Sequence, residues 1–174
     1  MYFDITNEYM ALLKQKCMIE SELKTCPKGY IYKKKIGDKE YAYLKYRNGT
    51  TVESVYLKNN EAEEIESKLN LRKTYEEKLL KINSRLIEIE RAAGYLSNSL
   101  SRQLNVLKLS IPMESLSSDE RFLSLSFSDA MTSIEGIPVT DDLRNTLSAW
   151  ENGKKTFSSI FTDTLRQYGF ITEE

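Results

Sequence analysis

A proline-free segment from Glu61 to about Ser110 is the feature that most constrains the fold of this chain. Within it, apolar residues recur at intervals of three and four, the heptad spacing that places side chains along one side of a helix. Seven residues form this heptad stripe: Leu79, Ile82, Leu86, Ile89, Ala93, Leu96 and Leu100. The segment is therefore predicted to be one long helix with a buried stripe, and Gly94 marks a break or bend.

The partner of the heptad stripe is left open by the sequence. Seven apolar residues on one seam cannot all stay in contact with water. They can pack against another helix of the same chain, form a homodimer through Leu79 to Leu100, or dock a helix of another protein.

The segments before the long helix predict a helix and then a small sheet. Residues 4–25 have apolar positions at helical spacing, and Pro27 prevents continuation. Residues 28–58 are rich in Tyr, Val, Ile and Thr and predict antiparallel strands at about 29–36, 40–47 and 50–57. Asn48-Gly49 predicts a type I′ hairpin turn between the last two strands.

Three shorter helices are expected after the long one, at 118–133, 140–151 and 156–168. Gly136 and Gly169 stand where C-terminal capping glycines belong, Pro138 prevents a helix from restarting, and Thr140 is placed to cap the next helix. The organisation expected is residues 1–110, a linker at 111–117, and a helical module at 118–174. The fold class is α+β, mainly α: a three-stranded antiparallel sheet, a long heptad-bearing helix and a C-terminal three-helix module.

The composition excludes several kinds of chemistry. The 174 residues include no histidine, which excludes Ser-His-Asp and Cys-His nucleophilic machinery. Cys17 and Cys26 lack a CxxC spacing and are expected to be reduced, partly buried thiols. We therefore predict no catalytic residue, no metal site and no cofactor. No apolar run approaches the ~20 residues of a membrane span, and the first residues lack a signal-peptide pattern, so the expectation is a cytoplasmic protein without a membrane partner.

Positive charge is concentrated in the predicted sheet, although the whole chain has a net charge of −1. Residues 28–58 contain eight Lys and Arg against three Asp and Glu, a local net charge of +5. Alternation along 40–47 places Tyr and cationic side chains on one face and apolar side chains on the other. These residue types suit phosphate and base contacts. The candidate nucleic-acid site, for DNA or RNA, comprises Lys33, Lys34, Lys35, Tyr41, Tyr43, Lys45 and Arg47.

The alternative for the same residues is a solvated basic face whose lysines protect the sheet edges. The order of three strands followed by a helix, over residues 29–69, also weakly resembles the three-stranded-sheet DNA-binding domains of phage and transposon integrases. That resemblance implies a DNA-binding role for the sheet.

The segment from about 127 to 170 contains "EGIPVT", then a helical pattern ending "AWENGK", then a helix ending "YGF". It resembles antitoxins of the VbhA type, which inhibit Fic-domain AMP transferases. In that family a helix carries Ser or Thr, three residues, then Glu and Gly or Asn, and the glutamate pairs with an arginine of the toxin. Glu135 and Gly136 match this motif, so the resemblance implies that they bind the partner. Met131 occupies the Ser/Thr position.

Together these patterns favour a non-enzymatic interaction protein of phage or mobile-element type. It would inhibit a protein partner by binding, as an antitoxin acting on a Fic-type toxin or as an inhibitor of another effector, such as an anti-CRISPR protein. The alternative is a nucleic-acid-binding accessory protein that uses the basic sheet.

Overall fold

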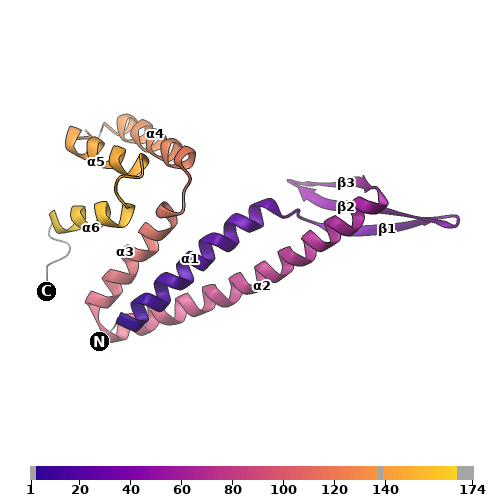
Figure 1. Cartoon of the computed structure of the whole chain (residues 1–174), viewed down its shortest axis with the longest axis horizontal. Helices are drawn as coiled ribbons and strands as arrows, with labels where there is room; N and C mark the ends of the chain where they lie inside the picture. The colour runs from indigo at the N-terminus through magenta and orange to yellow at the C-terminus, as the bar shows by residue number, and fades with distance from the viewer. Residues whose placement is uncertain (1–2, 137–138, 168–174) are drawn as a thin grey trace. The chain divides into compact units, whose positions relative to one another are not determined.

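The computed structural model describes residues 3–136 and 139–167. Within them, α1 is followed by β1, β2 and β3 and then by α2 to α6 (Figure 1). The mainly helical α+β class with a three-stranded antiparallel sheet is thereby confirmed. The chain divides into two compact units: Met18–Arg85, and Met1–Cys17 with Leu86–Glu174.

The first unit contains the end of α1, the three strands and the first part of α2. The strands pair antiparallel in chain order, so β2 is central and each strand is joined to the next by a short hairpin. Figure 1 shows the turn between β1 and β2 extending past the start of α2. The bounds of these elements are Phe3–Thr25 (α1), Tyr30–Ile36 (β1), Lys39–Asn48 (β2), Thr51–Leu57 (β3) and Asn59–Leu96 (α2).

The hairpin between β2 and β3 lies where the sequence predicts it, but its turn is of another kind. Asn48 pairs with Thr51, so the two central residues of the turn are Gly49 and Thr50. Gly49 has φ +60°, and among the described residues only glycines have positive φ, whereas a type I′ turn needs it at both central positions. A glycine in the first central position is typical of a type II′ turn. The predicted type I′ turn is therefore wrong.

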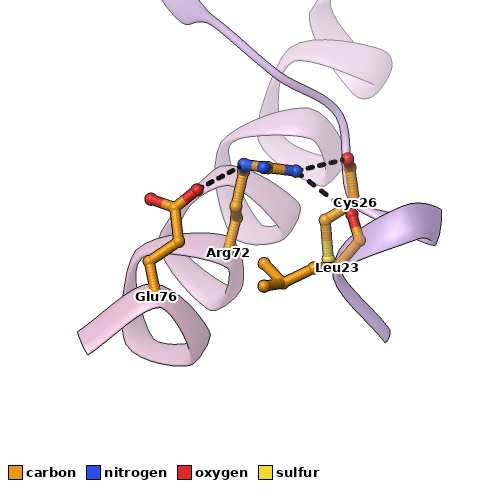
Figure 2. Close-up of polar contacts among 4 residues, drawn as sticks. All are labelled: Leu23, Cys26, Arg72 and Glu76. Carbon is orange, nitrogen blue, oxygen red and sulfur yellow. Dashed lines mark hydrogen bonds and ion pairs between the residues drawn. The ribbon is translucent and has the colours of Figure 1, made fainter. Parts of the chain in front are cut away.

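Arg72 of α2 ties the end of α1 to α2 within this unit (Figure 2). Its Nη1 donates to the carbonyl oxygens of Leu23 and Cys26, each at 3.1 Å, and its Nε lies 2.8 Å from Oε1 of Glu76. Carbonyl groups in the last turn of a helix lack intrahelical partners, and a cation there also opposes the negative end of the helix dipole. Cys26 is a buried free thiol and Cys17 is half-buried and free.

The second unit is helical and holds most of the buried core. It joins the start of α1 and the end of α2 to four further helices, α3 (Asn98–Glu114), α4 (Ser118–Ile134), α5 (Asp141–Glu151) and α6 (Phe157–Gln167). α3 packs against α6, and α5 contacts both α4 and α6. The buried side chains of this unit are Tyr9, Leu13, Leu86, Ile89, Ala93, Leu100, Leu104, Ser110, Ile111, Trp150 and Ile160.

The long helical segment breaks at Ser97 rather than at Gly94. α2 continues through Gly94 to Leu96, and Ser97 adopts extended backbone angles. Its hydroxyl accepts hydrogen bonds from the backbone N–H groups of Ser99 and Leu100, at 3.2 and 3.4 Å, and so caps α3. A serine cap with extended backbone angles ends one helix and begins another. A glycine inside a helix only lowers its stability, so α2 can continue through Gly94.

The chain buries five of the seven residues of the heptad stripe. Leu79 is half-buried and Leu96 is 51% exposed, so the chain itself does not bury the whole stripe, and burial of Leu96 across a homodimer stays a prediction. The other five stripe residues are at most 8% exposed, and the chain itself covers them. Because Ser97 ends the helix directly after Leu96, the following apolar residue, Leu100, belongs to a new helix with its own direction.

α3 also extends into the segment predicted to be a linker. The helix contains Pro112 and ends at Glu114, which leaves only three residues before α4. Ser110 and Ile111 are buried, so packing holds this last turn in helical form although proline removes a backbone donor. Glu114 then accepts hydrogen bonds from the backbone N–H and the hydroxyl of Ser158 in the first turn of α6.

The three C-terminal helices lie where the sequence predicts them, within one or two residues. Gly136 has φ +68° after the end of α4, as expected of a capping glycine. The hydroxyl of Thr140 accepts from the N–H of Leu143 at 3.3 Å and caps α5. Pro138 and Gly169, whose predicted roles are at helix ends, lie outside the described residues.

Candidate functional site

The strand register assigns every sheet residue to one of two faces. Directly paired residues of antiparallel strands point to the same face, and successive residues alternate. The pairs Tyr32–Tyr43 and Tyr43–Tyr56 therefore define one face across all three strands. We name it the tyrosine face, and its members are Tyr30, Tyr32, Lys34, Ile36, Lys39, Tyr41, Tyr43, Lys45, Arg47, Val52, Ser54 and Tyr56.

The tyrosine face carries all of the sheet's net positive charge. Its four cations are Lys34, Lys39, Lys45 and Arg47, and none of its members within the three fully described strands is acidic. The opposite face carries Lys33 and Lys35 together with Glu40 and Glu53, so its charges cancel. Residues 28–58 have a net charge of +5, and alternation along the strands places a net charge of +4 on the tyrosine face.

The structure divides the predicted nucleic-acid residues between the two faces. Lys34, Tyr41, Tyr43, Lys45 and Arg47 share the tyrosine face. The other two predicted residues pair across the sheet with residues of the opposite face, Lys33 with Ala42 and Lys35 with Glu40. Consecutive lysines on a strand cannot act on one ligand surface, because their side chains alternate.

Three tyrosines outside the predicted nucleic-acid site also belong to the tyrosine face. Tyr30 is 58% exposed, Tyr32 41% and Tyr56 51%. They come from β1 and β3, whereas the predicted alternation covers only the central strand. Extending the same two-residue period through both hairpins would have found them.

The aromatic rings of this face contact one another and one cation. The ring of Tyr56 lies 5.6 Å from that of Tyr43 in an edge-to-face arrangement and 6.2 Å from that of Tyr41. Nζ of Lys45 lies 4.0 Å from the ring centre of Tyr32, a cation–π contact. These contacts hold the side chains in place on a surface that remains open to solvent.

On the opposite face, Glu53 accepts hydrogen bonds from neighbouring polar side chains. The hydroxyl of Tyr46 donates to Oε2 of Glu53 at 2.5 Å, and Nδ2 of Asn48 donates to Oε1 of Glu53 at 2.6 Å. These hydrogen bonds, from Tyr46 first and Asn48 second, lower the pKa of Glu53, and the same contact raises the pKa of Tyr46. The Glu53 carboxylate is thus held on the opposite face, away from the cations of the tyrosine face.

The second candidate site lies at the end of α4, where Glu135 and Gly136 match the antitoxin motif. Glu135 is the C-cap residue, with its N–H donating to the carbonyl of Met131 at 3.0 Å, and its side chain is exposed. Gly136 turns the chain away through its positive φ. The carboxylate is therefore presented at the tip of the helix.

The rest of α4 is unusual because none of its residues is buried. Four apolar side chains recur at intervals of four, four and three residues, so they line one side of the helix. They are 40–80% exposed. We name this set the α4 stripe: Leu123, Phe127, Met131 and Ile134. The motif alone pointed to Met131, although the helical spacing of all four residues is readable in the sequence.

Arg121 holds α4 on α5 from the side away from this stripe. Its Nε donates to the carbonyl of Leu116 at 3.0 Å and its Nη1 to the carbonyl of Trp150 at 3.2 Å. Its guanidinium carbon also lies 5.8 Å from the centre of the buried Trp150 ring. α4 is thus anchored by a polar contact while its apolar side faces water.

The hydroxyl groups nearest to the motif position are already engaged. Thr132 donates to the carbonyls of Ser128 and Asp129, at 3.0 and 3.1 Å, and Ser133 donates to the carbonyl of Asp129 at 2.7 Å. Such back-bonding to the preceding turn uses the hydroxyl proton within the helix. Neither residue replaces the Ser or Thr that the motif has in place of Met131.

Among residues 3–136 and 139–167, no group of three or more Cys, Asp and Glu side chains is arranged to hold a metal ion. None of the helices in this described part is both long and apolar enough to cross a membrane. No protein-family model, curated protein or solved structure matches the chain.

Proposed function

We propose that this chain is a non-enzymatic protein that inhibits a macromolecular partner by binding it through α4 and Glu135. The observation that carries the proposal is the exposed carboxylate of Glu135 at the tip of an amphipathic helix whose apolar side faces water. Helices of this kind bind by laying apolar anchors into a groove of another protein. The α4 stripe supplies the anchors, and Glu135 supplies a charge at the end of the groove.

A Fic-domain AMP transferase is the partner that we favour, because residues 127–170 resemble VbhA-type antitoxins. In this proposal the carboxylate of Glu135 pairs with an arginine of the toxin and blocks productive binding of ATP. A charge pair enclosed by a binding interface is sensitive to the loss of one member, because the other charge is left buried without a partner. Another effector, including a host-defence complex, would be engaged through the same surface.

Met131 gives this chain a different contact from the one the motif describes. A Ser or Thr at this position would offer a hydroxyl, whereas Met131 continues the α4 stripe one turn before Glu135. Methionine adapts its shape to irregular apolar surfaces. We infer that affinity here depends more on apolar contact and less on a hydrogen bond from this position.

The proposal is tested by measuring AMP transfer by a Fic-domain AMP transferase, with the full chain added in increasing amounts. The parent protein should inhibit. Glu135→Gln keeps the size of the side chain but removes its charge, and it should weaken inhibition by about 30-fold or more, in line with the loss of one member of an enclosed pair. Phe127→Ala should weaken binding of the enzyme because it removes an anchor of the α4 stripe.

Asp129→Asn is the matched control, because Asp129 is an exposed carboxylate of the same helix that stands outside the α4 stripe. It should leave inhibition unchanged. If Glu135→Gln inhibits as strongly as the parent, Glu135 serves only as the C-cap residue of α4. If the parent neither binds nor inhibits the enzyme, the Fic assignment is wrong.

A further inference from the structure

We propose that the tyrosine face is a second binding site and that its ligand is a single-stranded nucleic acid. Three tyrosines form a row across the sheet at the level of Tyr43, with Tyr32 and Tyr56 as its neighbours. Cations stand on both sides of this row along the strands. Lys34 and Lys39 lie toward one end of the sheet, and Lys45 and Arg47 toward the other.

This arrangement complements a ligand that has flat, partly apolar groups between negative charges. A single strand of DNA or RNA has this pattern, because each base is flanked by phosphates and offers a ring face for stacking. A duplex turns its ring faces inward and presents groove edges and phosphates instead. Exposed tyrosine rings on the two outer strands of the face, Tyr32 at 41% and Tyr56 at 51%, therefore favour unpaired bases.

An acidic protein would satisfy the charge of the tyrosine face but not its rings. Four cations without an acid among them attract any polyanion. Stacking on sheet aromatics adds affinity for bases in particular, and is worth about 1–3 kcal/mol per base in proteins that bind single strands. The combination on one face, and its absence from the opposite face, favours a nucleic acid over an acidic protein.

The first test is fluorescence anisotropy of the full chain with labelled oligonucleotides of about 20 nucleotides, as single-stranded DNA, as single-stranded RNA and as duplex DNA. The single strands should bind more tightly than the duplex, and comparison of DNA with RNA identifies the natural class. If all four cations contact phosphates, affinity should fall by about 50-fold between about 50 and 200 mM salt. Failure to bind any single strand at low salt would overturn the proposal, and so would tighter binding to the duplex.

The alternation of the strand offers a matched control for charge. Lys34→Glu with Arg47→Glu reverses two charges on the tyrosine face, and Lys33→Glu with Lys35→Glu reverses two on the opposite face. The first pair should weaken binding by more than about tenfold and the second only slightly, because local phosphate contacts and not net charge carry the affinity. Equal losses in the two double variants would mean that attraction is nonspecific and that the face is no site.

The rings are tested separately from the charges. Tyr30→Ile and Tyr56→Ile replace an aromatic ring with a side chain that is also favoured in strands, so the stacking surface is lost while the strand is retained. Each variant should weaken binding of single strands by about 5- to 100-fold. Tyr95→Ile is the control, since Tyr95 is 93% exposed on α2, outside the sheet. Circular dichroism verifies that each variant is folded. Unchanged affinity in both folded sheet variants, with strong dependence on Lys34 and Arg47, would leave an electrostatic surface and overturn the stacking proposal.

Discussion

The hydroxyl of the fully buried Tyr9 in α1 donates a hydrogen bond of 2.6 Å to Oε1 of Glu90 in α2. The two residues are separated by 81 positions, so the bond joins distant parts of the chain within the helical unit. Lys108 of α3 approaches the same carboxylate, at 2.9 Å from Oε1. Burial, followed by the hydrogen bond and the negative charge of Glu90, raises the pKa of Tyr9. One carboxylate thus links three helices.

Because the pKa of Glu90 differs between the folded and unfolded states, the free energy of unfolding should depend on pH. Partial burial raises the pKa of Glu90, but the hydrogen bonds from Tyr9 and Lys108 and the charges of Lys108 and Lys16 outweigh it, so the pKa lies below the ordinary 4.5. The stabilisation is therefore present above pH 4.5 and is lost as pH falls through the lower folded value. Glu90→Gln should cost about 1–2 kcal/mol at neutral pH, and the difference from the parent should shrink in acid. Denaturant melts across this pH range measure it; a constant difference would contradict the assignment.

Leu86 and Leu96 belong to the same heptad stripe but should respond differently to truncation. Leu86 is 5% exposed, and Leu86→Ala should lower the free energy of unfolding by about 2–5 kcal/mol because it leaves a cavity. Leu96 is 51% exposed, and Leu96→Ala should cost less than about 1 kcal/mol. Chemical denaturation of both variants makes the comparison. Equal costs would show that the break at Ser97 does not release Leu96 from the core.

Arg72 should contribute through its two carbonyl partners more than through its ion pair (Figure 2). Arg72→Met keeps an apolar stem but leaves the carbonyls of Leu23 and Cys26 without this donor, at a cost of about 1–3 kcal/mol. Glu76→Gln removes only the pair with a half-exposed carboxylate and should cost less than about 1 kcal/mol. Thermal melting ranks the two variants. A larger effect of Glu76→Gln would reverse the assignment.

Gly29 and Gly37 test where the sheet needs glycine. Gly29 has φ +112°, and an added Cβ would lie 2.1 Å from the carbonyl oxygen of Lys45, so Gly29→Ala should disrupt the start of the sheet. Gly37 has φ +61° in an open turn where an added Cβ meets no neighbour, so Gly37→Ala should cost only about 1 kcal/mol. Amide hydrogen exchange across 30–57 reports the difference. Equal protection in both variants would mean that the approach of Lys45 to Gly29 is not a constraint.

The sequence by itself determined the elements whose signals are local. The two-residue period of the strands, the glycine in each hairpin turn, Thr140 as a cap of α5 and Gly136 after α4 depend on residues within a few positions of one another. The same local signals placed Tyr41, Tyr43, Lys45 and Arg47 on one face. Carried through both hairpins, they would also have placed Tyr30, Tyr32 and Tyr56 there and excluded Lys33 and Lys35.

Tertiary structure decided the features that depend on which surfaces meet. The heptad spacing continues from Leu79 to Leu100 although Ser97 begins a new helix, and the exposure of Leu96 depends on which surfaces the folded chain covers, which spacing along a sequence does not contain. Burial of Ile111 keeps α3 helical through Pro112, where local propensity predicts a linker. The exposure of the α4 stripe was likewise decided by the packing of the folded chain. An amphipathic pattern shows that one side of a helix is apolar, and only the packed fold determines whether the chain itself covers that side.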